Sequence, residues 1–347
     1  MAVQSPGLYS YAEWSARTGS DGKLSTLVNL MTQYNGVMED CLAAECTNGN
    51  VFQYTQVVGL PTPSRRALNQ GVARTQGQAA KQATTAVEYA DWSVLDNSIA
   101  GLGGQLAERR AQELALHMEG MAQKIASDMF YANRATDPTA FTGFANIYNT
   151  VSTATSQIAR NVIDCGGTGS SNSSIWLVGW GPKAIHTIFP QGMMAGMQHK
   201  DMGLLPCQDA NGYEFLGWRD WLQFNIGLAI HDWRYCVRAA NIDTTLLGTA
   251  NAANLINTLQ TMTMKPPTMP AGVAPVQTTD DRLGVITQPR SAIYLNRTVY
   301  AALDKQAQNK TNVLLKMEEW DGHTILTYRG IPIRVVDALL NTETRVV

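Results

Sequence analysis

The feature that most restricts the fold of this chain is a long stretch without acidic residues. From residue 46 to residue 87 there is no Asp or Glu, although the stretch contains Arg65, Arg66, Arg74 and Lys81. Between residues 65 and 85 the chain is rich in Gly, Gln, Ala and Thr and has too few large apolar side chains to form a core. Because such a segment buries little apolar surface, it cannot fold on itself. We therefore expect it to project from the body and to need a partner.

Strand patterns flank this stretch on both sides. Residues 51–58 (VFQYTQVV) alternate between apolar and polar side chains and end at the turn sequence GLPTP, which is typical of a strand. Residues 86–95 (AVEYADWSVL) alternate in the same way and are expected to be the returning strand. Together they predict a long, positively charged hairpin.

A long helix follows the hairpin. After the GLGG sequence at residues 101–104, residues 105–132 carry apolar side chains three or four positions apart, as on one face of a helix. These are Ala107, Ala111, Leu114, Met118, Met121, Ile125 and Met129. At about 1.5 Å per residue the helix would span about 40 Å and run along the whole body as a spine. Its other faces carry Glu108, Glu113 and Glu119.

The rest of the chain predicts a mixed α+β architecture. The first 23 residues are polar and aromatic without a regular period, which indicates an extended arm. Beyond residue 150 the patterns predict strands at 174–180, 224–230, 234–240 and 291–295, helices at 252–264 and 296–309, a hairpin at 324–336 and a last strand at 344–347. The length of 347 residues is sufficient for about two domains.

Charge and cysteine content exclude several classes of function. With 26 basic and 28 acidic residues the formal charge is −2, so the chain has no overall basic field for sequence-specific DNA binding. Only 16% of residues are charged, against about 25% in average proteins, which suits surfaces that contact other protein. The five cysteines include no C-x-x-C pair and indicate reduced, intracellular thiols. Neither a signal peptide nor a membrane-spanning segment is expected.

Motifs for catalysis or cofactor binding are absent from the sequence. Residues 101–106 (GLGGQL) lack the third glycine of a dinucleotide fingerprint, and no G-x-S-x-G is present. His199, Cys207, His231 and Cys236 could be imagined as metal ligands, but their spacing matches no zinc module. No catalytic residue, metal or cofactor is therefore predicted.

Several segments resemble a known family of structural proteins. They are residues 166–182 (GGTGSSNSSIWLVGWGP), 188–192 (IFPQG), 195–198 (AGMQ), 294–299 (YLNRTV) and 330–337 (GIPIRVVD). With the order of arm, hairpin, long helix and mixed lobe, they resemble tailed-phage major capsid proteins of the Hong Kong 97-type fold, and more closely the coat proteins of epsilon-15-like short-tailed phages.

The resemblance implies a division of the chain and a set of partners. It implies an N-terminal arm at 1–45, an E-loop with its flanking strands at 46–95, a P-domain with the spine helix at 96–150, an A-domain at 151–340 and a return strand to the P-domain at 341–347. The protein would assemble with itself, as hexamers and pentamers, into an icosahedral head enclosing double-stranded DNA, which it would contact non-specifically. Scaffolding, portal and cement or decoration proteins are further expected partners, with assembly in the host cytoplasm and the virion as destination.

The same resemblance suggests where subunits meet. In this fold the E-loop and N-terminal arm of one subunit lie across its neighbours. The candidate contacts are Arg65, Arg66, Arg74 and Lys81 on the hairpin, facing Glu88, Glu108, Glu113 and Glu119 of an adjacent copy. Lys81 is the only lysine on the hairpin, and its surroundings lack the glutamate and asparagine context of the crosslinking lysine in the founding phage, which leaves crosslinking open. Two alternatives remain, namely an encapsulin-like nanocompartment shell and a soluble α+β enzyme.

Overall fold

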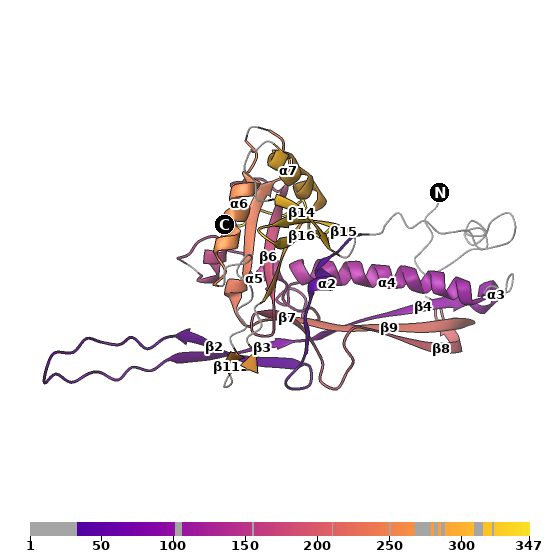
Figure 1. The fold of residues 1–347 in the computed structure, drawn as a ribbon. Helices are drawn as coiled ribbons and strands as arrows, with labels where there is room; N and C mark the ends of the chain where they lie inside the picture. Colours follow the sequence, from indigo (N-terminus) through magenta and orange to yellow (C-terminus); the bar gives the residue numbers. More distant parts are fainter. Residues whose placement is uncertain are drawn as a thin grey trace. The chain divides into compact units, whose positions relative to one another are not determined.

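The computed structural model describes residues 33–100, 106–154, 156–209, 211–249, 251–267, 279–280, 284–285, 289–308, 315–320 and 323–347. These residues form two compact units (Figure 1). The smaller unit contains Glu88–Lys124 and Gly196–Asn225, and the larger unit contains Gln33–Val87, Ile125–Ala195 and Ile226–Val347. Helix α4 (Leu106–Tyr131) and strand β9 (Glu214–Ile230) each have residues in both units.

The smaller unit is a sheet with the first part of α4. Strand β9 lies between β8 (Met197–Gln208), with which it pairs antiparallel, and β4 (Val87–Asp96). A short helix, α3 (Asn97–Ala100), follows β4. Leu95 is buried against Leu106 and Trp218, which connects the sheet to the helix through a small apolar cluster.

The larger unit is built on a mixed sheet. Its strands run in the order β14 (Leu315–Trp320), β15 (His323–Tyr328), β16 (Ile331–Val335), β13 (Arg290–Leu295), β6 (Asn172–Trp180), β7 (Ile185–Phe189) and the end of β9. In addition, β10 (Cys236–Asp243) pairs with β6 and with β5 (Val162–Asp164), and β1 (Ala43–Glu45) pairs with β7. Every residue of β6 is buried; the apolar run from Ile175 to Trp180 predicts this, whereas Asn172, Ser173 and Ser174 before it are polar.

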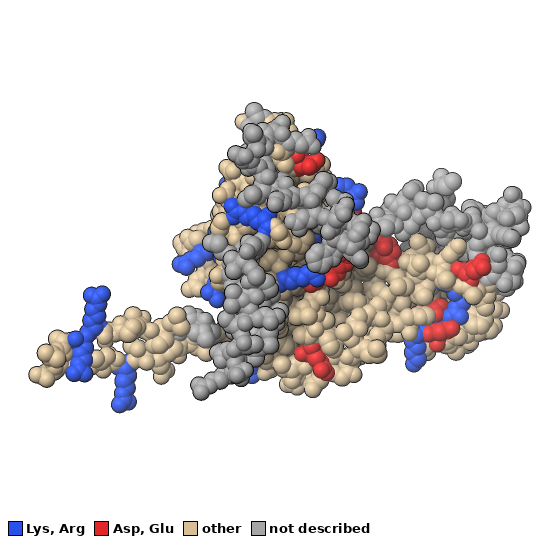
Figure 2. Space-filling view, in the orientation of Figure 1, with Lys and Arg blue, Asp and Glu red and all other residues tan. Residues whose placement is uncertain are grey.

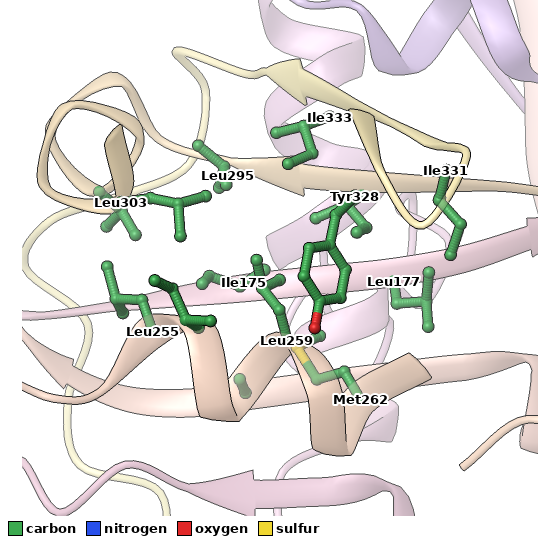
Figure 3. Close-up of a cluster of buried hydrophobic side chains, with 14 of the residues drawn as sticks. Ile175, Leu177, Leu255, Leu259, Met262, Leu295, Leu303, Tyr328, Ile331 and Ile333 are labelled. Atoms are coloured by element: carbon green, nitrogen blue, oxygen red, sulfur yellow. The ribbon is translucent and has the colours of Figure 1, made fainter. Parts of the chain in front are cut away.

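Two helices complete the main core of this unit. Figure 3 shows Leu255, Leu259 and Met262 of α6 (Leu255–Met264) facing Ile175 and Leu177 of β6, with Leu303 of α7 (Arg297–Gln308) beside them. The predicted helices at 252–264 and 296–309 are confirmed with small shifts at their ends. Asn254 caps α6 by accepting a hydrogen bond from the Asn257 backbone N–H at 3.2 Å, which is the role its side chain favours.

Shorter elements connect these parts. They are α2 (Val37–Asp40), α5 (Phe144–Ile147), the 3-10 turns η2 (Ile158–Asn161) and η3 (Trp233–Tyr235), and the two-stranded pair of β11 (Thr279–Asp280) and β12 (Gly284–Val285). Among the described residues, no helix is both long and apolar enough to cross a membrane. All five cysteines are described and carry free thiols.

The burial of α4 agrees with the predicted stripe in its second half only. Met121, Ile125 and Met129 are buried, but Ala107, Ala111 and Met118 are exposed and Leu114 is half-buried. In the first half the buried positions are Arg109 and Glu113 instead. Helix spacing identifies an apolar face, whereas contacts with other segments decide which face is covered, and in the first half of α4 the covered positions include Arg109 and Glu113.

The hairpin differs from the prediction in its returning strand. Strand β2 (Val51–Gly59) is where its pattern predicts, but it pairs antiparallel with β3 (Gln78–Thr85), and β4 lies in the sheet of the smaller unit. The side chains of β3 are polar or small and mostly exposed, so their pattern did not indicate a strand. A backbone ladder pairs β3 with β2, and backbone hydrogen bonds need no apolar side chains.

The C-terminal residues are not the predicted return strand. Within residues 341–347 there is one antiparallel bridge, between Glu343 and Asn172 at the start of β6. Asn241 then binds the backbone of Val346 from both sides, donating to its carbonyl and accepting from its N–H at 2.8 Å each. The last residues are therefore held by a single bridge, by the Asn241 side chain and by a backbone hydrogen bond from Val151 to Val347, and not by a strand ladder.

Candidate intersubunit contact surface

The connection between β2 and β3 is an extended, exposed tip. All residues from 60 to 79 are exposed, and Leu68 is 93% exposed. Its hydrogen bonds are local: Gln70 donates its N–H to the Ala67 carbonyl, and the Gln70 side chain accepts from the Ala67 N–H, both at 3.2 Å. Figure 1 shows the tip running out beyond the paired strands. We call residues 60–77, which connect the two strands, the hairpin tip.

The hairpin carries four basic side chains that have no acidic partner among the described residues. Arg65, Arg66 and Arg74 lie on the tip and Lys81 lies on β3, and all four side chains are exposed. None of them forms an ion pair with any residue that the structure describes. Figure 2 shows basic side chains standing out from the hairpin with no acidic side chain among them. Among the described residues the cluster therefore has no ion-pair partner that would stabilise it.

The base of the hairpin, unlike its tip, is anchored to the larger unit. The Gln56 side chain donates to the carbonyl oxygens of Ile230 and His231 at 3.2 and 2.6 Å. Arg134 donates to the hydroxyl of Thr85 at the end of β3. At Gly227 on β9 a Cβ atom would lie only 2.7 Å from the Thr85 carbonyl oxygen, so glycine permits this close approach. The tip therefore projects from a fixed root.

The four predicted acidic partners differ in accessibility. Glu88 on β4 and Glu108 on α4 are exposed. Glu119 is half-buried and accepts a hydrogen bond from Gln123 at 2.7 Å. Glu113 is only 5% exposed, so in this conformation its carboxylate cannot reach a neighbouring chain. The expectation that all three helix glutamates lie on free faces is wrong for Glu113, because this side chain is buried within its own chain.

A group of ion pairs in the smaller unit was not predicted from the sequence. Arg110 on α4 donates to Asp201 on β8 at 2.6 Å and to Asp220 on β9 at 2.7 Å. The hydrogen bond from Arg110 lowers the pKa of the exposed Asp201. His199 also contacts Asp220, at 2.9 Å, and His117 contacts Asp91 at 2.6 Å. These groups lie far apart in the sequence, so no local spacing could have indicated them.

An exposed aromatic patch lies on the same sheet. Trp92 and Trp221 are in contact, with ring centroids 4.4 Å apart and ring planes tilted by 53°, and the guanidinium of Arg219 lies 4.1 Å from the Trp92 ring centroid. Trp92 is 40% exposed, and the patch borders a shallow pocket of about 500 Å³ that Lys200 and Met202 also line. The alternating pattern of β4 places Trp92 on one sheet face, but only the pairing with β9 brings Trp221 beside it.

The residues considered as metal ligands do not form a site. His199 contacts Asp220, and His231 packs against His186 with ring centroids 5.1 Å apart. Cys207 and Cys236 are buried, and burial raises the pKa of the Cys236 thiol far above its usual value. In the described ranges no three His, Cys, Asp or Glu side chains come close enough together to hold a metal ion.

The chain is similar to one protein family and to several solved structures. The family model of the major capsid protein GP7 matches residues 19–347. Among solved structures, the cryo-EM structure of bacteriophage Epsilon15 is similar, with 30% identity, a TM-score of 0.74 and coverage of 100% of this chain and 99% of that chain. The bacteriophage JBD30 capsid has 9% identity and a TM-score of 0.46, covering 96% and 99% of the two chains.

An encapsulin complex from Synechococcus elongatus also appears, with 10% identity, a TM-score of 0.41 and coverage of 68% of this chain and 96% of that chain. No curated protein sequence matches the chain.

Proposed function

Because this chain belongs to the family of the major capsid protein GP7, we propose that its basic hairpin tip binds an acidic surface on a neighbouring copy. The protein is a major capsid protein with a Hong Kong 97-like α+β fold, and it forms part of the icosahedral capsid of a phage virion. We propose that specific charged residues hold adjacent subunits together.

The observation that carries the proposal is the exposure of the tip. All residues of the tip (60–77) are exposed in their own chain, and Arg65, Arg66 and Arg74 have no ion pair among the described residues. Ordering an exposed segment costs about 1–2 kcal/mol per residue in backbone entropy. A contact outside the chain would offset this cost, and the charge of the tip favours an acidic partner surface.

Glu88, Glu108 and Glu119 are the counter-charges that we propose on the neighbouring copy. Glu88 and Glu108 are exposed on β4 and α4, and Glu119 is half-buried on the same helix. Exposed ion pairs contribute only about 0–1 kcal/mol each. A shell repeats each of them in every subunit, so contacts that are weak singly become decisive together. Contacts of this heterologous kind close into rings and shells rather than pairs.

We propose the domain division and the assembly partners by analogy with the family. We assign residues 1–45 to an N-terminal arm, 46–95 to the E-loop region, 96–150 to the P-domain and 151–340 to the A-domain, with 341–347 returning to the P-domain. The copies would group as hexamers and pentamers around double-stranded DNA, which they contact non-specifically. Scaffolding, portal and cement or decoration proteins would assist assembly in the host cytoplasm. The chain would have no catalytic activity.

The test is to remove the four basic charges together. Arg65, Arg66, Arg74 and Lys81 are changed to Gln, and the melting temperature of the unassembled subunit is compared with the urea resistance of assembled shells. We expect an unchanged melting temperature and weaker shells, with the largest loss at low salt, where charge screening is least. A variant subunit that no longer folds would show that the segment belongs to a core and would overturn the proposal.

A matched control removes the same charge elsewhere. Arg160, Lys183, Lys305 and Arg345 are also exposed, and changing them to Gln alters net charge equally. Shells of this control should keep their wild-type salt dependence. If both quadruple variants weaken the shell alike, net charge rather than the hairpin tip is responsible.

The encapsulin-like alternative differs in cargo. A nanocompartment would enclose protein, whereas a phage head encloses DNA. Negative-stain electron microscopy of the expressed chain, with and without a co-expressed scaffold, followed by analysis of the contents, separates the two. Small oligomers in place of shells or capsomers would favour the enzyme alternative.

A further inference from the structure

Four aromatic rings meet where the hairpin joins the larger unit. His186 on β7 and His231, directly after β9, lie with ring centroids 5.1 Å apart and an interplanar angle of 33°. Phe52 of β2 lies edge-on to both, with centroids 5.0 Å from His186 and 5.4 Å from His231. Tyr54 of the same strand lies 4.4 Å from His231. The side of β2 that faces the larger unit therefore rests on two histidines.

Three ring nitrogens of this cluster have no partner at normal hydrogen-bond geometry among the described residues. His186 is 1% exposed, and both of its nitrogens are in this group, although the Gly181 backbone lies close enough to interact with the ring. The buried Nε2 of His231 also lacks a hydrogen-bond partner among the described residues, and so does the hydroxyl of Thr84, which lies opposite Phe52 in the hairpin ladder. An unpartnered nitrogen is tolerated more easily on a neutral imidazole than on a cation, which needs water or an acceptor for both N–H groups.

The charged neighbours do not favour protonated rings. Neither His186 nor His231 has an ion pair with a described carboxylate. Other titratable and charged groups on the elements packed here include Tyr54, Tyr148, Cys46, which belongs to the cluster that Phe52 packs against, Asp232, which pairs with Arg234 at 2.7 Å, and Arg134, a cation that donates to the Thr85 hydroxyl. Tyrosine and cysteine are neutral below neutral pH, and the carboxylate of Asp232 is already engaged.

We propose that His186 and His231 form a proton-sensitive latch for the hairpin: while neutral they hold Phe52 and Tyr54 by aromatic packing, and when protonated they release the base of β2 and β3. Two imidazolium rings 5.1 Å apart would repel each other, and burial would deprive both of solvation. A cation–π contact with Phe52 or Tyr54 could offset part of this cost for one ring but does not remove the repulsion between two.

The pH range of release follows from the same burial. Burial and, to a smaller extent, the neighbouring His231 lower the pKa of His186 from 6.5 to about 4, and a backbone hydrogen bond with Gly181 opposes this shift without cancelling it. Burial also lowers the pKa of His231. Since the open hairpin binds protons more readily than the closed one, the latch is complete above about pH 6.5 and is lost as the pH falls toward about 4.

This latch would operate within a single chain and does not depend on the proposed contact between hairpin tip and neighbour. Its consequence for a shell rests on that proposal. Once the base of the hairpin is released, the tip is no longer held in a fixed direction, so subunit contacts through the tip would weaken in acid. The two ideas fail separately, because the latch is measured on unassembled subunits and the tip contact on shells.

The test is hydrogen–deuterium exchange of the unassembled full chain at pH 7.5 and 4.5, with rates corrected for intrinsic exchange. In the wild type, protection at residues 50–56 and 84–86 should fall at least about ten-fold at pH 4.5, as linkage with a pKa near 4 requires. Protection of the buried strand β6 should stay unchanged. Equal protection of the hairpin at both pH values, or equal loss in β6, would overturn the latch.

Variants assign the effect to the histidine pair. The double variant His186→Phe and His231→Phe keeps aromatic rings without protonation, so its hairpin should stay protected at pH 4.5. The control double variant His117→Gln and His199→Gln should behave like the wild type. If the Phe variant does not fold, NMR titration of the wild-type histidines decides: His186 must stay neutral until the hairpin loses protection, and a ring that titrates near 6.5 with the hairpin still closed would refute the proposal.

Discussion

Arg238 on β10 and Glu343 near the C-terminus form an ion pair of 2.8 Å between side chains that are only 4% and 5% exposed. The remaining oxygen of Glu343 accepts a hydrogen bond from the Tyr131 hydroxyl at 2.5 Å, at the end of α4. Arg238 also donates to the Tyr148 carbonyl at 2.8 Å and lies over the Trp176 ring. This pair connects the last residues of the chain to the long helix and to the central strands.

Removing one member of this pair should destabilise the subunit strongly. Glu343→Ala leaves the Arg238 guanidinium buried without a counter-charge, and such changes cost about 3–5 kcal/mol. Urea unfolding of the unassembled chain measures the loss. Arg345→Gln is the control two residues away, because Arg345 is exposed and surface changes alter stability by about 0.5 kcal/mol or less. Equal stability of the two variants would mean that the pair is not buried in solution.

Two methionines one turn apart on α4 test which helix face is covered. Met121 is 7% exposed and Met118 is 40% exposed. Met121→Asp places a carboxylate among apolar side chains, so we expect a loss of several kcal/mol or no folded protein. Met118→Asp should leave the melting temperature of the unassembled subunit nearly unchanged. Similar effects at both positions would contradict the burial of α4 described above.

We expect substitution by alanine to have opposite effects on stability at two glycines. Gly227→Ala would place a Cβ atom 2.7 Å from the Thr85 carbonyl oxygen and 2.9 Å from Ala86 Cα, so we expect a loss of about 1–3 kcal/mol and faster exchange at the hairpin root. Gly120 lies inside α4, and nothing stands within 4 Å of the Cβ it would carry. Gly120→Ala should therefore raise stability by about 0.5–1 kcal/mol. Thermal unfolding of both variants provides the comparison.

Weak binding to DNA is expected of the unassembled protein. Its formal charge of −2 gives no long-range attraction for phosphates, so purified subunits or capsomers should bind DNA without sequence preference and at best with micromolar affinity at about 150 mM salt. Fluorescence anisotropy with labelled duplexes of different sequence measures this. Nanomolar affinity under those conditions would contradict a role in which the shell confines its DNA by geometry.

The sequence alone determined those elements whose side chains are all buried or all exposed. The apolar run of β6 is buried throughout, and the hairpin tip, which lacks both acids and apolar bulk, is exposed throughout. In both cases composition decides, because burying apolar surface is favourable and burying unpaired charge is costly. Both the fold class and the capsid family could be predicted from such segments.

Tertiary structure alone decided the features that depend on contacts between distant segments. The polar β3 is a strand because β2 pairs with it, and the first half of α4 buries Arg109 and Glu113 because of what packs against it. The meeting of Phe52, Tyr54, His186 and His231 joins segments more than 100 residues apart. Spacing along a chain shows which side chains share a face, but it carries no information about which surface will cover that face.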